Sequence, residues 1–130
     1  MKLVTKNTDY AIRAISYLAK NKGPAAVSEM SKALKISGPF LRKILQILNS
    51  EGILASRKGK YGGFEIAKPL DKIKLTELIY IFQGPVSLGE CLIRKHPCPE
   101  TSSCLLRKNL GRIKTIVEKE LNSITLDTLI

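Results

Sequence analysis

The chain has little of what marks several common classes of protein. Its 130 residues include no tryptophan and a single histidine, and aromatic side chains account for only 5%. No apolar run approaches the roughly 20 residues that a membrane-spanning helix needs. No apolar signal segment follows Met1, so we expect a cytoplasmic protein with no membrane partner. The length predicts one small domain with an extension.

Residue patterns of catalytic sites are scarce as well. The chain contains no Cys-x-x-Cys motif, and no nucleophile stands with a paired base in a recognisable pattern. A small redox enzyme or electron carrier is therefore the weakest hypothesis. We expect a protein that is not an enzyme and that has no small-molecule substrate.

Positive charge is plentiful and unevenly distributed. The formal net charge is +11. Residues 1–69 contain thirteen Lys or Arg against four Asp or Glu, a net charge of +9, whereas residues 70–130 contain nine against seven, a net charge of +2. Such a concentrated excess predicts a polyanionic partner. Because few aromatic side chains accompany it, double-stranded DNA is favoured over single strands, and an anionic membrane surface is the weaker alternative.

The spacing of apolar residues predicts two helices near the amino terminus. Over residues 7–20 they recur at i, i+3, i+4 and i+7, which is one face of an amphipathic helix. Thr8 or Asn7 is suited to cap the start of this helix. After a break at a glycine and a proline, residues 27–34 form a second, shorter helix with Ser28 as its expected cap.

A third helix and a hairpin complete a recognisable arrangement. After a turn over residues 35–38, Pro39 opens a helix that ends near residue 50. Helix, helix, short turn, helix is the helix-turn-helix pattern. Two short strands, over residues 53–57 and 64–67, then flank a glycine-rich turn, as in the wing of a winged helix.

The third helix and the wing carry the candidate DNA contacts. The amino-terminal end of the recognition helix reaches base edges in the major groove, and Arg42 is the best candidate to read a guanine. Basic wing residues would contact phosphates or enter the minor groove. The alternative is a basic hairpin that is merely solvated. The predicted DNA-binding residues are Ser37, Gly38, Pro39, Phe40, Arg42, Lys43, Arg57, Lys58, Lys60, Tyr61, Gly62 and Gly63.

Two further helices are predicted, one over residues 75–82 and a long one over residues 104–122. The long helix has an apolar stripe that needs a second apolar surface to cover it. A homodimer would bury the stripe and supply the two-fold symmetry that a palindromic promoter element needs, although packing within one chain is an alternative. The stripe consists of Leu106, Leu110, Ile113, Val117 and Leu121.

The expected fold class is mainly α with a small β-hairpin. We divide the chain into a winged helix-turn-helix DNA-binding domain over residues 1–84, a cysteine-bearing loop over residues 85–103, and a dimerisation helix with a carboxyl-terminal tail over residues 104–130.

Three cysteines, Cys91, Cys98 and Cys104, are spaced as C-x6-C-x5-C. An odd number cannot be fully paired within one chain, and these gaps fit a loop around one larger object better than a zinc knuckle. Three thiolates are one ligand short of either a tetrahedral zinc site or an iron-sulfur cluster. Two alternatives remain open: thiol redox switches, and a structural zinc site completed by His96.

The chain resembles the iron-sulfur-dependent winged-helix repressors that include IscR and the nitric-oxide sensor NsrR. The resemblance covers nearly the whole chain. It rests on Thr8-Asp9-Tyr10-Ala11, on Ser37 through Leu48 followed by Glu51-Gly52, on the wing from Ser56 through Phe64, on Ile73 through Gly84, and on the three cysteines.

This resemblance implies a homodimeric repressor whose promoter binding is gated by a cluster that senses nitric oxide, redox or iron-sulfur status. The three cysteines fall where the family keeps its ligands. IscR-type members place a histidine three residues beyond the third cysteine, and Arg107 stands there in this chain. NsrR-type members take an aspartate from the first helix of the partner subunit, and Asp9 stands at the matching place. The implied cofactor is a [4Fe-4S] cluster in preference to a [2Fe-2S] cluster.

Overall fold

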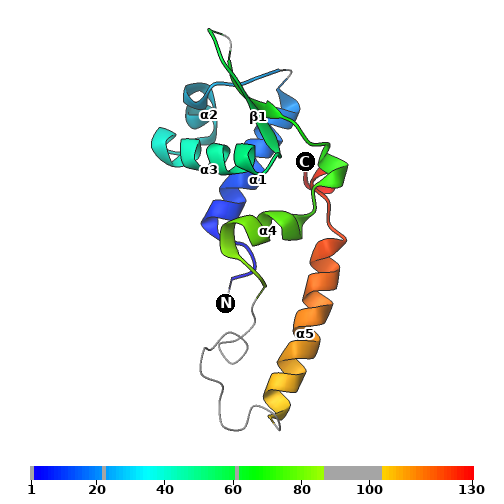
Figure 1. The fold of residues 1–130 in the computed structure, drawn as a ribbon. Helices are drawn as coiled ribbons and strands as arrows, with labels where there is room; N and C mark the ends of the chain where they lie inside the picture. Colours follow the sequence, from blue (N-terminus) through cyan, green and yellow to red (C-terminus); the bar gives the residue numbers. More distant parts are fainter. Residues whose placement is uncertain (1, 22, 61, 87–103) are drawn as a thin grey trace.

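The chain folds as a winged helix followed by one long helix (Figure 1). The computed structural model describes residues 2–21, 23–60, 62–86 and 104–130. The fold class was predicted correctly, since the structure is mainly helical with one two-stranded antiparallel hairpin. In chain order the elements are α1 (Lys6–Lys20), α2 (Val27–Leu34), α3 (Gly38–Ser50), β1 (Leu54–Arg57), β2 (Gly63–Ile66), η1 (Leu70–Lys72), α4 (Leu75–Gln83), α5 (Leu105–Asn122) and η3 (Leu126–Leu129). None of the helices in these ranges is both long and apolar enough to cross a membrane.

The predicted helix caps were wrong, although the helices themselves lie close to the predicted ranges. Helix α1 begins at Lys6, so Thr5 occupies the cap position and Thr8 lies inside the first turns. Helix α2 begins at Val27 with Ala26 at the cap, and Ser28 lies within the helix. Neither cap residue makes a capping hydrogen bond from its side chain to the helix backbone. These starts are therefore set by packing, and the Thr8 hydroxyl is used elsewhere.

The core forms where the apolar faces of α1 and α3 meet. Apolar residues at helical spacing on both helices are almost completely buried, and residues from α2, the hairpin and α4 join the same cluster. Because the four buried apolar residues of α3 point inward, the opposite, mostly polar face of this helix is left on the surface. The residues of α1 and α3 in this core are Ala11, Ala14, Ile15, Leu18, Leu41, Ile44, Leu45 and Leu48.

The hairpin is joined to the helices through a short backbone contact. The Ala25 N–H donates to the Phe64 carbonyl at 3.0 Å, and the Phe64 N–H donates to the Ala25 carbonyl at 2.9 Å. The backbone approaches so closely here that a Cβ on Gly63 would lie 2.1 Å from the Ala25 carbonyl oxygen. Gly63 also has a φ of 146°, which side chains disfavour. The wing therefore requires glycine at this position.

The chain returns to the winged helix after α5, which the sequence patterns did not reveal. Leu126 is fully buried in the main core. Its N–H donates to the Ile73 carbonyl, and an isolated β-bridge pairs Lys74 with Thr125. The carboxyl end of α5 is thereby fixed to the body, whereas its amino-terminal part extends away from it (Figure 1).

Gln83, the last residue of α4, joins that helix to the start of α1. Its side-chain Oε1 accepts hydrogen bonds from the Thr5 N–H and from the Thr8 hydroxyl, each at 2.8 Å. Its Nε2 donates to the Leu3 carbonyl at 3.4 Å. Among the described residues, Thr8 is the one polar residue classed as buried. Gln83 therefore satisfies a buried hydroxyl and holds the segment before α1 in place.

We expect Gly63→Ala to lower the free energy of unfolding by about 3 kcal/mol or more, because the new Cβ would collide with the Ala25 backbone. Gly59→Ala is the matched control. Gly59 also has a positive φ, of 107°, but its Cβ would meet open space, so its cost should stay at about 1–2 kcal/mol. Urea denaturation measures both values. Equal losses of unfolding free energy in the two variants would show that the close approach of Gly63 to Ala25 does not contribute to stability.

We expect Thr8→Val to lower the free energy of unfolding by about 1 kcal/mol, because it removes a buried hydrogen bond to Gln83 while keeping the shape of the side chain. Thr76→Val is the control, since the Thr76 hydroxyl bonds to Asn122 at an exposed position and should contribute less than about 0.5 kcal/mol. The two urea midpoints can be compared directly. A Thr8 variant as stable as the Thr76 variant would rule out a structural role for the Gln83 contact.

Candidate DNA interface and cysteine segment

The turn between α2 and α3 is held from both sides. Lys35 adopts a left-handed conformation with a φ of 56° and ends α2. Ile36 is buried in the core and anchors the turn from below. The Ser31 hydroxyl of α2 donates to the Ile36 carbonyl, which fixes the turn to the preceding helix. The angle between the two helices of the motif is therefore set by local contacts as well as by the core.

The amino-terminal end of α3 presents its basic residues to solvent. Arg42 and Lys43 are exposed, as are Ser37 and Pro39. A shallow surface depression between α2 and α3 lies beside Arg42. Its lining residues are Val27, Ser28, Ser31, Lys32, Gly38, Pro39 and Arg42. This end of α3 combines positive charge, hydroxyl donors and a concave surface, which are the features that a DNA-reading helix needs.

Phe40 has a different environment from the other predicted contacts on α3. It is half-buried, and its ring packs edge-on against Tyr10 of α1 with centroids 5.5 Å apart. Lys6 Nζ lies 5.5 Å from the centroid of the same tyrosine ring. The structure thus gives Phe40 a packing role, because it joins the start of α1 to the start of α3.

The wing brings its three basic residues together at the end of the hairpin. Arg57, Lys58 and Lys60 are all exposed. A Cβ on Gly62 would lie 2.2 Å from the Arg57 carbonyl oxygen, so the tight turn requires glycine. Tyr61, another predicted contact, lies outside the described residues. Sequence reasoning missed an acidic residue on the wing: Arg57 Nε is 2.5 Å from Oε1 of Glu65.

The candidate metal ligands are only partly described. Cys91, Cys98 and His96 lie outside the described residues. Asp9 is half-exposed in the first turn of α1, and its carboxylate pairs with Arg13 at 3.0 Å. Within the part of the chain that the structure covers, no three His, Cys, Asp or Glu side chains come together as a metal site.

Cys104 is the one predicted cysteine ligand within the described ranges. It is partly exposed and occupies the cap position of α5. The amino-terminal end of a helix carries a partial positive charge, which suits an anionic ligand atom such as a thiolate. Arg107 follows one turn later on α5 and is exposed. A guanidinium adds positive charge near the sulfur and does not serve as a metal ligand.

The apolar stripe of α5 divides into two parts. Leu106 and Ile113 are 62% and 43% exposed, and the neighbouring Ile116 is 55% exposed. In contrast, Leu121 is buried against Leu75 and Ile79 of α4, with Val117 and Ile124 packed around this smaller cluster. At the carboxyl end of α5, the stripe predicted for a dimer therefore packs on α4 of the same chain. Its exposed part is amino-terminal.

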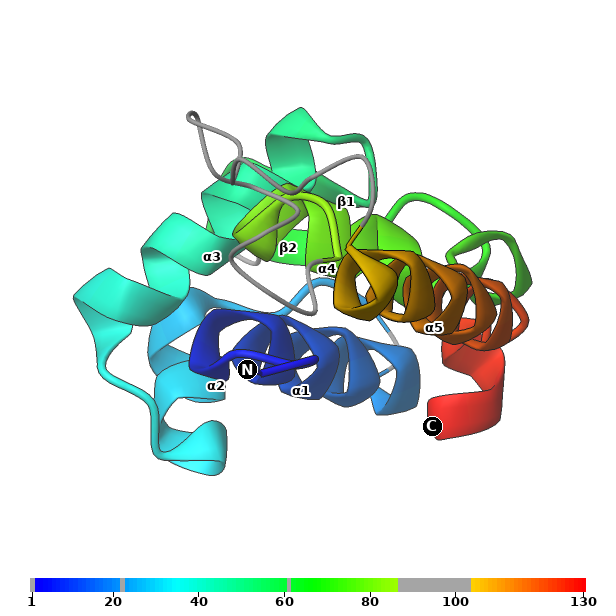
Figure 2. The same cartoon turned by 90° about the horizontal axis from the view of Figure 1, so that it is seen from below.

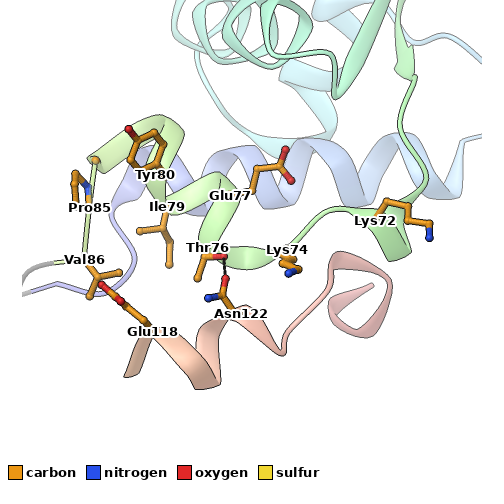
Figure 3. A pocket seen from close by; sticks show the side chains of 11 residues that line it. Lys72, Lys74, Thr76, Glu77, Ile79, Tyr80, Pro85, Val86, Glu118 and Asn122 are labelled. Carbon is orange, nitrogen blue, oxygen red and sulfur yellow. Dashed lines mark hydrogen bonds between the residues drawn. The ribbon is translucent and has the colours of Figure 1, made fainter. Parts of the chain in front are cut away.

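A surface depression lies between α4 and α5 (Figure 3). The Thr76 hydroxyl, which donates to Oδ1 of Asn122, ties the two helices together at its floor. Val86, the last described residue before the gap at residues 87–103, and Glu118 both line this depression. Figures 1 and 2 show α3 and α5 on opposite sides of α4, so a contact through α5 leaves the recognition helix accessible.

Comparison with known proteins places the chain in a family. Residues 4–130 match the Rrf2 family model, described as an iron-dependent transcriptional regulator. An HTH-type transcriptional regulator of Aquifex aeolicus is 33% identical over 124 residues, covering 93% of this chain and 86% of that protein.

Two solved structures share the fold. CymR of B. subtilis, named as the global cysteine regulator of that organism, superimposes with a TM-score of 0.76 at 25% identity, covering 99% of this chain and 96% of that chain. IscR of T. potens superimposes with a TM-score of 0.75 at 22% identity, covering 99% of this chain and 85% of that chain. The exposed basic helix, the wing and the match over residues 4–130 agree, and the chain belongs to the Rrf2 family of transcriptional regulators.

Proposed function

We propose that the chain is a homodimeric repressor whose binding to a palindromic promoter element is gated by an iron-sulfur cluster. The observation that carries the proposal is the position of α1. This helix bears Asp9 and is joined through Tyr10 and Phe40 to the start of the recognition helix. Asp9 precedes Tyr10 in the chain, and Tyr10 packs on Phe40 at the start of α3. A change at Asp9 could therefore reach the DNA-reading end of α3 through this ring contact.

The DNA-binding part of the proposal rests on charge and geometry. The exposed end of α3 and the wing together present Arg42, Lys43, Arg57, Lys58 and Lys60. Arginine can donate two parallel hydrogen bonds to the O6 and N7 atoms of guanine, which makes Arg42 the base-reading candidate. The wing residues would contact phosphates or the minor groove, which adds affinity with little sequence discrimination.

The dimer rests on the exposed part of the α5 stripe. Large apolar side chains at Leu105, Leu106, Ile113 and Ile116 face solvent on one helix. A second copy of this helix would cover them, and a two-fold dimer would present two recognition helices to two half-sites. In this proposal, residues 1–84 bind DNA, residues 85–103 contain cluster ligands and residues 104–130 form the dimer interface.

The donor set fits an iron-sulfur cluster. Cys91, Cys98 and Cys104 supply thiolates, the ligands that such clusters require, and Asp9 of the partner subunit would supply the fourth. Cys104 lies at the amino-terminal end of α5, where an anionic ligand is favoured. A bound cluster would supply iron that reacts with nitric oxide or oxygen, which is the signal chemistry of NsrR-type regulators. The likeness to NsrR, with its aspartate, favours four irons over two.

Asp9 gives the proposed switch two alternative states. Within one chain its carboxylate pairs with Arg13. When Asp9 binds the cluster of the partner subunit, it would give up its ion pair with Arg13. When the cluster is lost, Asp9 would form this ion pair again. Asp9 lies between Thr8, which bonds to Gln83, and Tyr10, which packs on Phe40. A change in the partner of Asp9 would therefore alter both of these contacts. The population of DNA-binding dimers would shift accordingly.

A second candidate function is a repressor without a cluster. The likeness to CymR, whose name refers to cysteine regulation, favours it. The three cysteines would then act as thiol redox switches or, with His96, as a structural zinc site. Metal analysis of the purified protein distinguishes these forms from the cluster form.

We expect DNA affinity to fall steeply with salt, since several Lys and Arg side chains displace counterions from phosphates. Arg42→Ala should relax discrimination at one base position by about 1–3 kcal/mol. Competition binding with base-substituted duplexes measures this. Lys119→Ala, on the last turn of α5, serves as a control that should leave discrimination unchanged. Unaltered discrimination in the Arg42 variant would mean that another residue reads the DNA.

We expect protein purified without air to be brown and to contain close to four irons per chain, in keeping with a [4Fe-4S] cluster. Asp9→Ala should lose the visible absorption band faster in air, because the fourth ligand is gone. Asp71→Ala, which removes an exposed carboxylate in η1, should keep the band. Iron and sulfide counts accompany the spectra. An Asp9 variant with wild-type cluster stability would exclude this residue as the ligand, and a colourless wild-type protein would favour the cluster-free repressor.

A further inference from the structure

One acidic residue stands alone on the basic wing. Between residues 52 and 70 the chain has four Lys or Arg, and Glu65 is the only acid. A carboxylate on a surface that meets phosphates costs binding energy unless it has a specific task. The position of Glu65 in the hairpin indicates what that task is.

The strand register puts Glu65 and Arg57 on the outer face of the hairpin. Leu54 pairs with Ile66, and Ser56 pairs with Phe64. Leu54, Phe64 and Ile66 pack on the core, so this set of positions faces inward. Side chains alternate along a strand, and the intervening positions therefore face outward. Arg57 and Glu65 are diagonal neighbours on that outer face, within reach of each other.

The pair has one fixed and one exposed member. Glu65 Oε1 lies 2.5 Å from Arg57 Nε. The Glu65 side chain is only 24% exposed, whereas that of Arg57 is 64% exposed. Bonding through Nε occupies one edge of the guanidinium, and the N–H donors of the terminal nitrogens on its other edges remain available to another acceptor. A short, partly buried side chain thus holds a long, exposed one by its inner nitrogen.

We propose that Glu65 is a positioning residue for DNA binding, and that it orients Arg57 so that the terminal nitrogens of the guanidinium meet the DNA backbone or minor groove. The arginine side chain would otherwise lose considerable rotamer freedom on binding. By restricting it beforehand, Glu65 offsets the repulsion between its own charge and the phosphates. The proposal rests on the proposed use of the wing as a DNA contact.

A double-mutant cycle tests this role. The wild type, Glu65→Ala, Arg57→Ala and the double variant are titrated as full-length protein against a fluorescent duplex of mixed sequence at one fixed salt concentration. We expect Glu65→Ala to weaken binding about threefold or more when Arg57 is present. When Arg57 is absent, the same change should leave binding unchanged or tighten it slightly, because only a negative charge is removed. Glu65→Gln should retain most of the affinity, since its amide oxygen still accepts from Nε.

Thermal melting shows whether each variant is folded, and Glu77→Ala provides the control for charge. It removes an acid that also pairs with a lysine, Lys68, but on α4 and away from the outer face of the wing. Tighter binding for Glu65→Ala in both backgrounds would show that Glu65 only repels DNA. Tighter binding only when Arg57 is present would show that Glu65 competes with DNA for the guanidinium. Either result overturns the proposal. If Arg57→Ala itself has no effect, the use of Arg57 as a DNA contact fails, and the positioning role fails with it.

Discussion

The contact between the apolar faces of α1 and α3 is the interaction on which the rest of the structure depends. Leu41 and Leu45 of α3 pack with Ala11 and Ile15 of α1, and all four are fully buried. This burial sets the orientation of α3 and turns its basic residues outward. Core packing tolerates little change in volume, so the recognition helix is fixed in place relative to α1. The wing and the carboxyl-terminal Leu126 are attached to the same core.

In the proposed mechanism, the same arrangement would let α1 connect the cysteine-bearing segment with the proposed recognition helix α3. The first turns of α1 carry the candidate ligand Asp9 and contact α4 through the hydrogen bond from Thr8 to Gln83. Tyr10 then contacts Phe40 at the start of α3. In the sequence, Cys91 follows eight residues after Gln83, the last residue of α4. In the proposed mechanism, a chemical change at Asp9 would alter the position of α1, and through Tyr10 and Phe40 it would alter DNA binding by α3.

Much of the fold could be predicted from the sequence because it depends on local patterns. The apolar spacing in α3 and the glycines of the wing indicated the winged helix, and the match to regulator structures confirmed it. Two of the failures involve contacts between distant parts of the chain. Thr8 has the sequence features of a cap, yet its hydroxyl bonds to Gln83, 75 residues away. Leu126 gave no periodic signal, although it fills the core.

The candidate site was predictable to a similar extent. Arg42 and Lys43 lie on the exposed end of α3, as expected from helical periodicity. Phe40 stays a predicted DNA contact, but the sequence did not reveal that its half-buried ring also packs edge-on against Tyr10. Leu121 was assigned to the dimer stripe but packs on α4, since the chain after α5 turns back toward the body. The pairing of Glu65 with Arg57 depends on strand register, which the sequence did not specify.

The central claim is that the state of the cluster controls binding to DNA. It is tested most directly by adding nitric oxide stepwise to the anaerobic protein bound to a fluorescent promoter duplex, while absorbance and fluorescence anisotropy are recorded together. The account predicts that DNA is released in parallel with loss of the cluster absorption band. Complete loss of the band with the DNA still bound would contradict it.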